Sequence, residues 1–309
     1  MTETFYLRRA TVQVGSVIVK HEGDEDLRIR FKVAKNPWAT EPNRAHIEIY
    51  NLADSRREIL DTLIARTRPV EGGPPAPRAQ VTIEAGYAGN SNPGVGRIFK
   101  APLMSVAHSR ESGDWVTKIL SSSISARDVP VTATFSGPNT TVGSVAVDLL
   151  KKISKAAGDL DVTSAVSRAL QGDLNGLEQT LNKAFSVSGM GMDVLEKLVS
   201  EHGFRISEQD GSIVLLKTDE KVGRSIVLNA DSGLVGTIDP ITDVRRPGVY
   251  LVRAKSLLRH DIRIGAAVQL DSVVQKGLFV AEEVEHHGDT HGGADGFVTS
   301  FKGRGVRKR

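Results

Sequence analysis

Alternating apolar and charged residues constrain this fold most, because they recur in two stretches of the chain that flank a stretch of helical periodicity. In Leu27–Ala34, apolar residues occupy every second position and arginine or lysine most positions between them. Successive side chains of a strand point to opposite faces, so this alternation predicts a half-buried strand. The segment His46–Leu52 repeats the pattern. Further strands are expected at residues 5–14, 17–20, 81–85, 97–99, 103–109 and 115–121.

A helix and a loop interrupt these strands. The helix is expected to run from a cap at Asp54 or Ser55 to Ile64. Gly72 and Pro75 belong to a run of glycines and prolines that should form an exposed loop. Strands that start about 8–12 residues apart are typical of a barrel or a sandwich. Of these two, we expect a β-barrel domain over residues 1–136.

The pattern changes after Gly137. Thr140 or Thr141 can cap a helix in which apolar residues recur at helical spacing as far as Ile153. Together with the elements that follow, this helix predicts a small α/β domain over residues 137–222. Those elements are helices at residues 164–170, 174–184 and 191–202, and a hairpin at residues 204–216 with its turn at 209–211.

The β pattern returns at Ser225 and predicts a second β-barrel domain over residues 223–309. Its strands are expected at residues 251–254, 267–270, 278–286 and 296–303. The expected fold is therefore mainly β with an α/β insert. It is an α+β protein in which two β-barrel domains flank the small α/β domain.

Composition excludes several classes of protein. The sequence has no cysteine, which excludes disulfides, thiolate metal sites and cysteine nucleophiles together, and fits a reducing cytoplasm. The 40 basic residues nearly balance the 37 acidic ones, so the net charge of +3 does not indicate a nucleic-acid binder. No apolar run approaches the ~20 residues that span a bilayer, and we expect no membrane segment.

Catalytic motifs are missing from the sequence. It has no Gly-x-Ser-x-Gly elbow, no phosphate-binding loop and no His-Glu-x-x-His zinc helix. We therefore expect no catalytic residue, no cofactor and no enzymatic activity. His286, Asp289 and His291 are weak candidates for a metal site, because imidazole and carboxylate groups bind zinc or iron. However, His286 and His287 are neighbours on an expected strand and should point to opposite faces.

The same region favours a polar strand end followed by an exposed hairpin. Glu282, Glu283 and Glu285 are expected on the strand face that meets water or a partner. Exposed loops carry many partner-specific contacts. We therefore expect contacts at the Gly72–Pro77 loop, at Gly72 and Pro75, and at the His287–Asp295 hairpin, at His287, Asp289 and Asp295.

Several segments of the sequence match one known family in order, from about residue 29 to residue 301. The most specific is Ala45–Leu52, Ala-His-Ile-Glu-Ile-Tyr-Asn-Leu, preceded by Pro42 and Asn43. The others include Glu84–Tyr87, Gly96–Phe99, Ser109–Trp115, Gly189–Leu195, His202–Gly203, Asp210–Gly211, Asp231–Gly236, Gly248–Val249, Ser256–Leu258, Ile264–Gly265, Gly277–Val280 and His286–Thr290. Together these segments resemble the phage baseplate (tail-tip) hub proteins of the late-control or tail hub type.

The resemblance implies a non-enzymatic structural protein with two tail-tube-like barrels per chain. Three copies would form a ring that adapts the sixfold tail tube to a threefold central spike. The implied partners are the tube protein, the spike or tip protein, baseplate wedge or ring proteins and the C-terminus of the tape-measure protein. DNA would pass through the lumen without sequence-specific binding. The implied location is the virion tail baseplate, after assembly in the host bacterial cytoplasm.

Three alternatives remain open. One is the spike-hub component of a phage-like contractile secretion system, and another is a distal-tail ring protein. The secretion version continues into an oligosaccharide-binding-type fold and a needle, whereas this sequence ends at Arg309, so we expect a separate spike protein. The third is a tail-associated cell-wall hydrolase, for which Glu283, His286 and Asp289 would be the residues to substitute.

Overall fold

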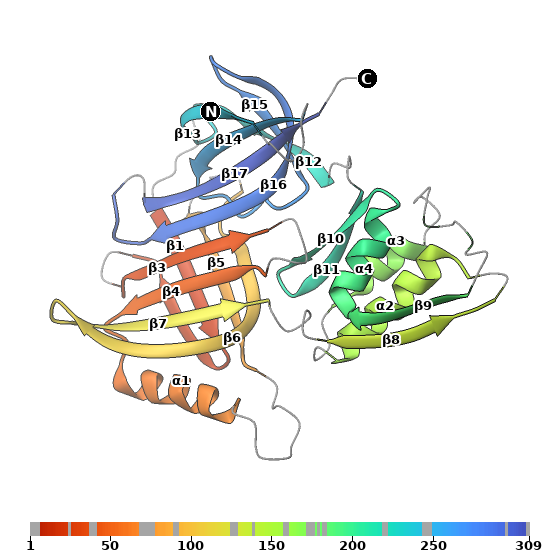
Figure 1. Cartoon of the computed structure of the whole chain (residues 1–309). Helices are drawn as coiled ribbons and strands as arrows, with labels where there is room; N and C mark the ends of the chain where they lie inside the picture. Colours follow the sequence, from red (N-terminus) through yellow and green to blue (C-terminus); the bar gives the residue numbers. More distant parts are fainter. Residues whose placement is uncertain are drawn as a thin grey trace. The chain divides into compact units, whose positions relative to one another are not determined.

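The structure is a computed structural model, and it describes residues 7–23, 26–36, 42–67, 78–88, 93–123, 129–137, 140–156, 161–170, 177, 180, 184–217, 222–242, 249–293 and 296–306. The chain forms two compact units (Figure 1). The first comprises residues 1–35, 44–122 and 221–309, and the second comprises residues 36–43 and 123–220. The middle of the chain is therefore inserted into a unit built from both of its ends. The three-domain division at residues 136 and 222 stays a prediction.

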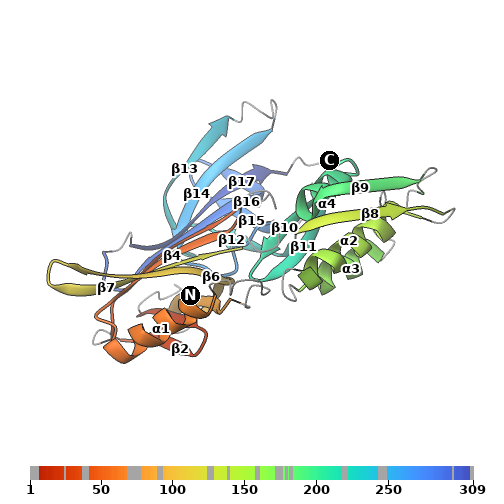
Figure 2. The same ribbon diagram turned by 60° about the horizontal axis from the view of Figure 1, so that its bottom comes forward.

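We call the part of the first unit before the insertion the N half. Its elements are β1 (Leu7–Val14), β2 (Val17–His21), β3 (Ile29–Lys35), β4 (Arg44–Tyr50), α1 (Asp54–Arg66), β5 (Gln80–Ala88), β6 (Gly96–Glu111) and β7 (Asp114–Ser122). The strands lie in the order β3-β4-β7-β6-β5-β1-β2, and every neighbouring pair is antiparallel. Figure 2 shows β6 and β7 as a long hairpin, with α1 nearby.

The part of the first unit after the insertion is the C half. Its strands are β12 (Val222–Leu228), β13 (Leu234–Thr242), β14 (Tyr250–Leu257), β15 (Ala266–Asp271), β16 (Lys276–Asp289) and β17 (Phe297–Gly305). They lie in the order β13-β14-β17-β16-β15-β12. Strand β16 also pairs antiparallel with β3, which joins the two halves into one 13-stranded sheet. Among the described strands this sheet is open, because β13 and β2, at the two ends of the strand order, do not pair with each other.

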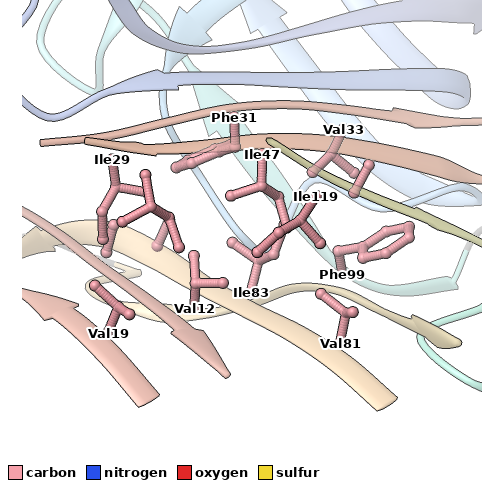
Figure 3. Close-up of a cluster of buried hydrophobic side chains, with 14 of the residues drawn as sticks. Val12, Val19, Ile29, Phe31, Val33, Ile47, Val81, Ile83, Phe99 and Ile119 are labelled. Atoms are coloured by element: carbon pink, nitrogen blue, oxygen red, sulfur yellow. The ribbon is translucent and has the colours of Figure 1, made fainter. Parts of the chain in front are cut away.

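The core of the N half follows from the alternation along its strands. Ile29, Phe31 and Val33 of β3 point into it and meet Ile47 of β4 and Phe99 of β6 (Figure 3). Each such side chain, when fully buried, contributes about 1.5–3 kcal/mol to folding. Arg30 and Lys32, between the apolar residues of β3, therefore lie on the other face of the sheet.

The second unit contains three described helices and two two-stranded sheets. The elements are β8 (Pro130–Phe135), α2 (Val142–Ala156), α3 (Thr163–Leu170), β9 (Phe185–Met190), α4 (Gly191–Ser200), β10 (Phe204–Gln209) and β11 (Ser212–Lys217). Of the two predicted caps, Thr140 and Thr141, it is Thr141 that caps α2, because its hydroxyl accepts the N–H of Ser144 and the Ser144 hydroxyl accepts the N–H of Thr141. No helix in the described part of the chain is long and apolar enough to cross a membrane.

Several sequence predictions were wrong in detail. The two strands expected at 97–99 and 103–109 are one strand, β6. Pro102 does not interrupt it, because the hydrogen bond to the neighbouring segment at this point comes from Leu103, whose N–H donates to the carbonyl of Ala79. Helix α1 has Ala53 at its N-cap without a side-chain cap, and Asp54 is already helical. Strands β8, β9 and β13 were not predicted. Most of the helix expected at 174–184 lies outside the described residues.

Candidate functional site

The predicted contact residues fall into two groups. Gly72, Pro75 and Asp295 lie outside the described residues. His287 and Asp289 are at the end of β16, and the turn that follows runs toward β17. Of the predicted contact residues, His287 and Asp289 are the two in the part of the chain that the structure describes.

The side chain of Asp289, at the end of β16, contacts two arginines at the start of β3, Arg28 and Arg30. Its carboxylate accepts hydrogen bonds from Arg28 Nε at 3.0 Å and Arg28 Nη2 at 2.6 Å, while Arg30 Nε lies 3.4 Å away. The backbone N–H of His291 adds a further hydrogen bond at 3.1 Å. Burial alone would raise the pKa of Asp289, but the hydrogen bonds from Arg28 and from the His291 N–H, with the charges of Arg28 and Arg30, outweigh it and the pKa lies below its usual value. The carboxylate is therefore charged at neutral pH.

The guanidinium of Arg8, on β1, donates hydrogen bonds to three backbone carbonyl groups of the same hairpin. It donates to the carbonyl oxygen of Asp289 at 2.9 Å, to that of Gly293 at 2.6 Å and to that of Gly292. Its guanidinium also lies 5.6 Å from the ring centre of Phe297. Because a guanidinium offers several donors in a fixed plane, these bonds fix the shape of the turn. Arg8 therefore fixes the backbone of Asp289, Gly292 and Gly293.

The histidines of this region point in different directions. His286 is fully buried and bonds Thr299 Oγ1 through Nδ1 at 2.9 Å, whereas the side chain of His287 is 40% exposed. Burial, reinforced by the charge of Lys35, holds the pKa of His286 well below its usual value, so the ring is neutral. The ring of His291 lies 5.1 Å from that of His21. Among the described residues, no three histidine or carboxylate groups are placed to hold a metal ion.

The three glutamates of β16 do not share one face, so the prediction for Glu282 was wrong. Glu282 is buried and accepts a hydrogen bond from Arg304 at 2.9 Å, whereas Glu283 and Glu285 are about half exposed. The pairing of β16 with β17 shifts register between Ala281 and Glu283. A β-bulge of this kind inserts one extra residue and changes which positions face the interior.

An open groove of about 600 Å³ crosses the face of the sheet near Asp289. Its charges are largely paired, since Arg30 lies 3.1 Å from Glu48 and Lys32 lies 3.9 Å from Glu285. The groove therefore presents mixed charge and no isolated anion site. Its lining comes from β14, β17, β16, β3 and β4: Arg30, Phe31, Lys32, His46, Glu48, Lys255, His287, Gly288, Asp289, Gly296, Val298 and Ser300.

Asn51, in the most specific of the resembling segments, connects β4 to the β6–β7 hairpin. Its backbone adopts the left-handed conformation, with φ at +54°. Its side chain accepts the N–H of Trp115 at 3.0 Å and donates to Asp114 at 3.0 Å, and its own N–H donates to the carbonyl of Trp115. Asparagine suits this position because it tolerates positive φ and its amide both donates and accepts.

In the second unit, a buried carboxyl lies where the chain enters that unit. Glu208 of β10 is only 8% exposed, and its side chain bonds Ser123. Burial raises the pKa of Glu208 to about 8, although the bond from Ser123 opposes this shift. Ser123 also accepts the N–H of Asn43 at 2.9 Å, and the Asn43 side chain donates to the Glu208 carbonyl. Glu208 lies two residues after Ile206 and four after Phe204, and this spacing is a sequence signal for an inward position, although Arg205 and Ser207 between them are buried as well.

Comparison with solved structures identifies the fold. The chain resembles a 43 kDa tail protein of prophage MuSo2 from Shewanella oneidensis, with a TM-score of 0.59 and 9% identity over 96% of this chain and 98% of that one. It also resembles a tail protein from Neisseria meningitidis MC58, with a TM-score of 0.58 and 10% identity over 97% of both chains. At these identities the likeness concerns the fold alone.

A third structure is the c3393 protein of Escherichia coli, described as a component of the type VI secretion system with structural similarity to T4 phage tail proteins gp27 and gp5. Its TM-score is 0.55 at 10% identity, over 96% of this chain and 77% of that one. No curated protein matches the sequence. A family model described as "Baseplate hub gp41" matches residues 7–285, nearly the whole sequence. The chain therefore belongs to the baseplate hub gp41 family, structural proteins of the phage tail baseplate.

Proposed function

We propose that this protein is the central hub of a tail baseplate and acts without catalytic turnover. Three copies form a ring that adapts the sixfold tail tube to a threefold spike, and the ring lines the channel through which DNA is ejected. Its other partners are baseplate ring or wedge proteins and the end of the tape-measure protein. Assembly takes place in the host cytoplasm, before the tail is complete.

The observation that carries this proposal is the internal joint between β16 and β3. The N half and the C half each contribute a similarly ordered sheet, and the joint makes these sheets continuous. If each half is one tube-like barrel wall, a single chain supplies two of six equivalent walls. Three chains then match a sixfold tube, because closed rings repeat one interface around an axis. The domain limits that we propose are 1–136, 137–222 and 223–309.

The mass of the purified full-length chain tests this proposal. Sedimentation equilibrium over a range of protein concentrations should give three times the monomer mass, and electron microscopy of particles should place three copies around a channel. A chain that stays monomeric at every concentration and has no affinity for tube protein would count against the hub. Within the particle, the Gly72–Pro77 loop and the His287–Asp295 hairpin are the contacts that we propose with neighbouring baseplate proteins.

A hub of a contractile secretion system is the second candidate, and the similarity to the Escherichia coli secretion component favours it. Binding to tube protein from the phage tail or from the secretion apparatus distinguishes the two. A distal-tail ring protein would instead lie around the tube as a ring without a spike below it. A hydrolase would release peptidoglycan fragments and lose this activity on single substitution of Glu283, His286 or Asp289.

A further inference from the structure

The two halves of the first unit repeat one arrangement of strands. In chain order and in sheet order, β3, β4, β5, β6 and β7 of the N half correspond to β13, β14, β15, β16 and β17 of the C half. Strand β12 lies beside β15 as β1 lies beside β5. However, β12 and β15 are parallel, whereas β1 and β5 are antiparallel. The C half contains no helix between β14 and β15, where the N half has α1.

A hydrogen bond between equivalent side chains supports this correspondence. His108 of β6 bonds Thr117 of β7 through Nδ1 at 3.0 Å, and His286 of β16 bonds Thr299 of β17 through Nδ1 at 2.9 Å. In both halves the histidine and the threonine lie directly opposite each other in the ladder. The pairing of residues between β6 and β7 therefore gives a residue-by-residue alignment with β16 and β17.

The two long strands also carry a bulge at the same place. The pairing of β6 with β7 shifts between Leu103 and Ser105, and that of β16 with β17 shifts between Ala281 and Glu283. Each strand pairs with the preceding strand of its own half before the bulge. The segments after the bulge, Ser105–Glu111 and Glu283–Asp289, have the same length.

Only one of these two segments has a strand on its outer edge. Val284–Asp289 of β16 pairs with Lys35–Arg30 of β3 and so forms the joint between the halves. The equivalent segment of β6, Val106–Glu111, pairs with β7 on one edge and with no described strand on the other. Likewise β13, the equivalent of β3, pairs with β14 alone among the described strands.

We propose that the outer edge of β6, at Val106–Glu111, pairs antiparallel with β13 of a second copy of this chain. This inference rests on the proposed function, because it names the contact that holds the ring together. The register follows from the joint within the chain. Within the chain, Lys32 of β3 lies opposite His287 of β16, and Ala34 lies opposite Glu285. Their equivalents are Asp239 and Ile241 on β13, and Ser109 and Ala107 on β6. Between two copies, Asp239 should therefore lie opposite Ser109, and Ile241 opposite Ala107.

Physical reasons favour a second copy as the occupant of both edges. An exposed strand edge presents unpaired N–H and C=O groups and tends to recruit another strand. Each copy offers one β6 edge and one β13 edge, so the contact is head-to-tail and can close into a ring. Pro240 has no N–H, so a ladder in this register lacks the hydrogen bond opposite His108, and the ladder of β13 with β14 is irregular between Val235 and Asp239. Both features oppose the addition of strands to β13, so regular pairing is confined to a short stretch of this edge.

Engineered disulfides can test the register, because the chain has no cysteine of its own. Residues directly opposite each other in an antiparallel ladder have Cα atoms about 4.5–5.5 Å apart, which is within the reach of a disulfide. The test variant is Ser109→Cys with Asp239→Cys, and Ala107→Cys with Ile241→Cys is the second. The double variant Lys32→Cys with His287→Cys, across the internal joint, is the positive control and should form its disulfide within one chain.

The matched negative control is Ser105→Cys with Asp239→Cys. It places one cysteine four residues farther along β6, about 13 Å from its expected partner and beyond disulfide reach. After mild oxidation of the purified full-length chain, both test variants should give reducible dimers and trimers on denaturing gels. The negative control and each single-cysteine variant should remain mainly monomeric, because the contact joins two different edges.

The outcomes separate this inference from the proposed function. Trimers in solution, with test variants that cross-link no better than the negative control, would overturn the strand pairing and leave the trimeric hub intact. Absence of both oligomers and cross-links would overturn the pairing and also count against the hub. Cross-linked trimers whose disulfides map by mass spectrometry to residues 109 and 239 would establish the pairing in the stated register.

Discussion

Replacing Glu208 by glutamine should stabilise the second unit at neutral pH. The carboxyl is almost fully buried, and burial raises its pKa from the usual value near 4.5 to about 8. In the unfolded chain the same group ionises at its usual pKa, so the folded state holds a proton that the unfolded state has lost. Glutamine is neutral at every pH and keeps an oxygen that can accept the hydroxyl of Ser123.

The sign and size of the effect follow from proton linkage. A raised carboxyl pKa means that the folded state is not penalised below pH 4.5, and that its stability falls as the pH rises toward 8. Integrating between the two pKa values gives a loss of about 3 kcal/mol between pH 4.5 and pH 7, and about 4 kcal/mol by pH 8. The glutamine variant should lack this loss.

Hydrogen exchange of peptides from β10, β11 and α4 measures the stability of the second unit by itself. Wild type and variant are compared at the same pH, so the intrinsic exchange rates cancel. Glu201→Gln is the matched control, because that side chain is exposed and its replacement should leave the pH dependence unchanged. An identical pH dependence for wild type and Glu208→Gln, or a variant less protected than wild type at pH 8, would refute the reasoning.

Five further substitutions, at four positions, test the first unit. Asp289→Asn removes the charge partner of two arginines and should cost about 1–3 kcal/mol in denaturant unfolding at pH 7; because the folded pKa of Asp289 is lowered, the difference from wild type should shrink as the pH falls through that pKa. Asn51→Gly loses only the side-chain bonds, about 1 kcal/mol, whereas Asn51→Ala adds backbone strain at positive φ and should lower the melting temperature further. Gly288→Ala places a methyl group 2.0 Å from a ring carbon of Phe31 and should cost more than about 2 kcal/mol, whereas Gly293→Ala enters open space and should be nearly neutral in the same melts.

The sequence alone predicted the elements in which alternation is strict. From Ile29 to Val33 in β3 and from Ala45 to Ile49 in β4, the apolar residues face the core and the polar residues between them face out, so a period of two is enough to place both. The same rule separated His286 from His287. Helix α2 was predicted with its cap, because Thr141 precedes an apolar stripe that only one helical face can bury.

The rule failed where the backbone departs from regular pairing. A bulge in β16 adds one residue to the strand and moves Glu282 to the interior. Nothing in the local sequence Ala-Glu-Glu predicts this bulge. Strand β13 contains Gly236 and Pro240, which are typical of loops, yet it pairs with β14 on both sides of an irregularity. In such segments the pairing strand, distant in the sequence, determines the conformation, and the local sequence does not identify that strand.

The repeat within the first unit is hidden for a related reason. His108 and His286 are equivalent, as are Thr117 and Thr299, but the connection between β16 and β17 is longer than that between β6 and β7, and α1 has no counterpart in the C half. No single offset therefore aligns the two halves, and only the hydrogen-bond register does so. A strand edge recruits its partner through backbone N–H and C=O groups that every residue except proline carries. The candidate assembly edge at β6 is thus defined by topology, and composition gives almost no sign of it.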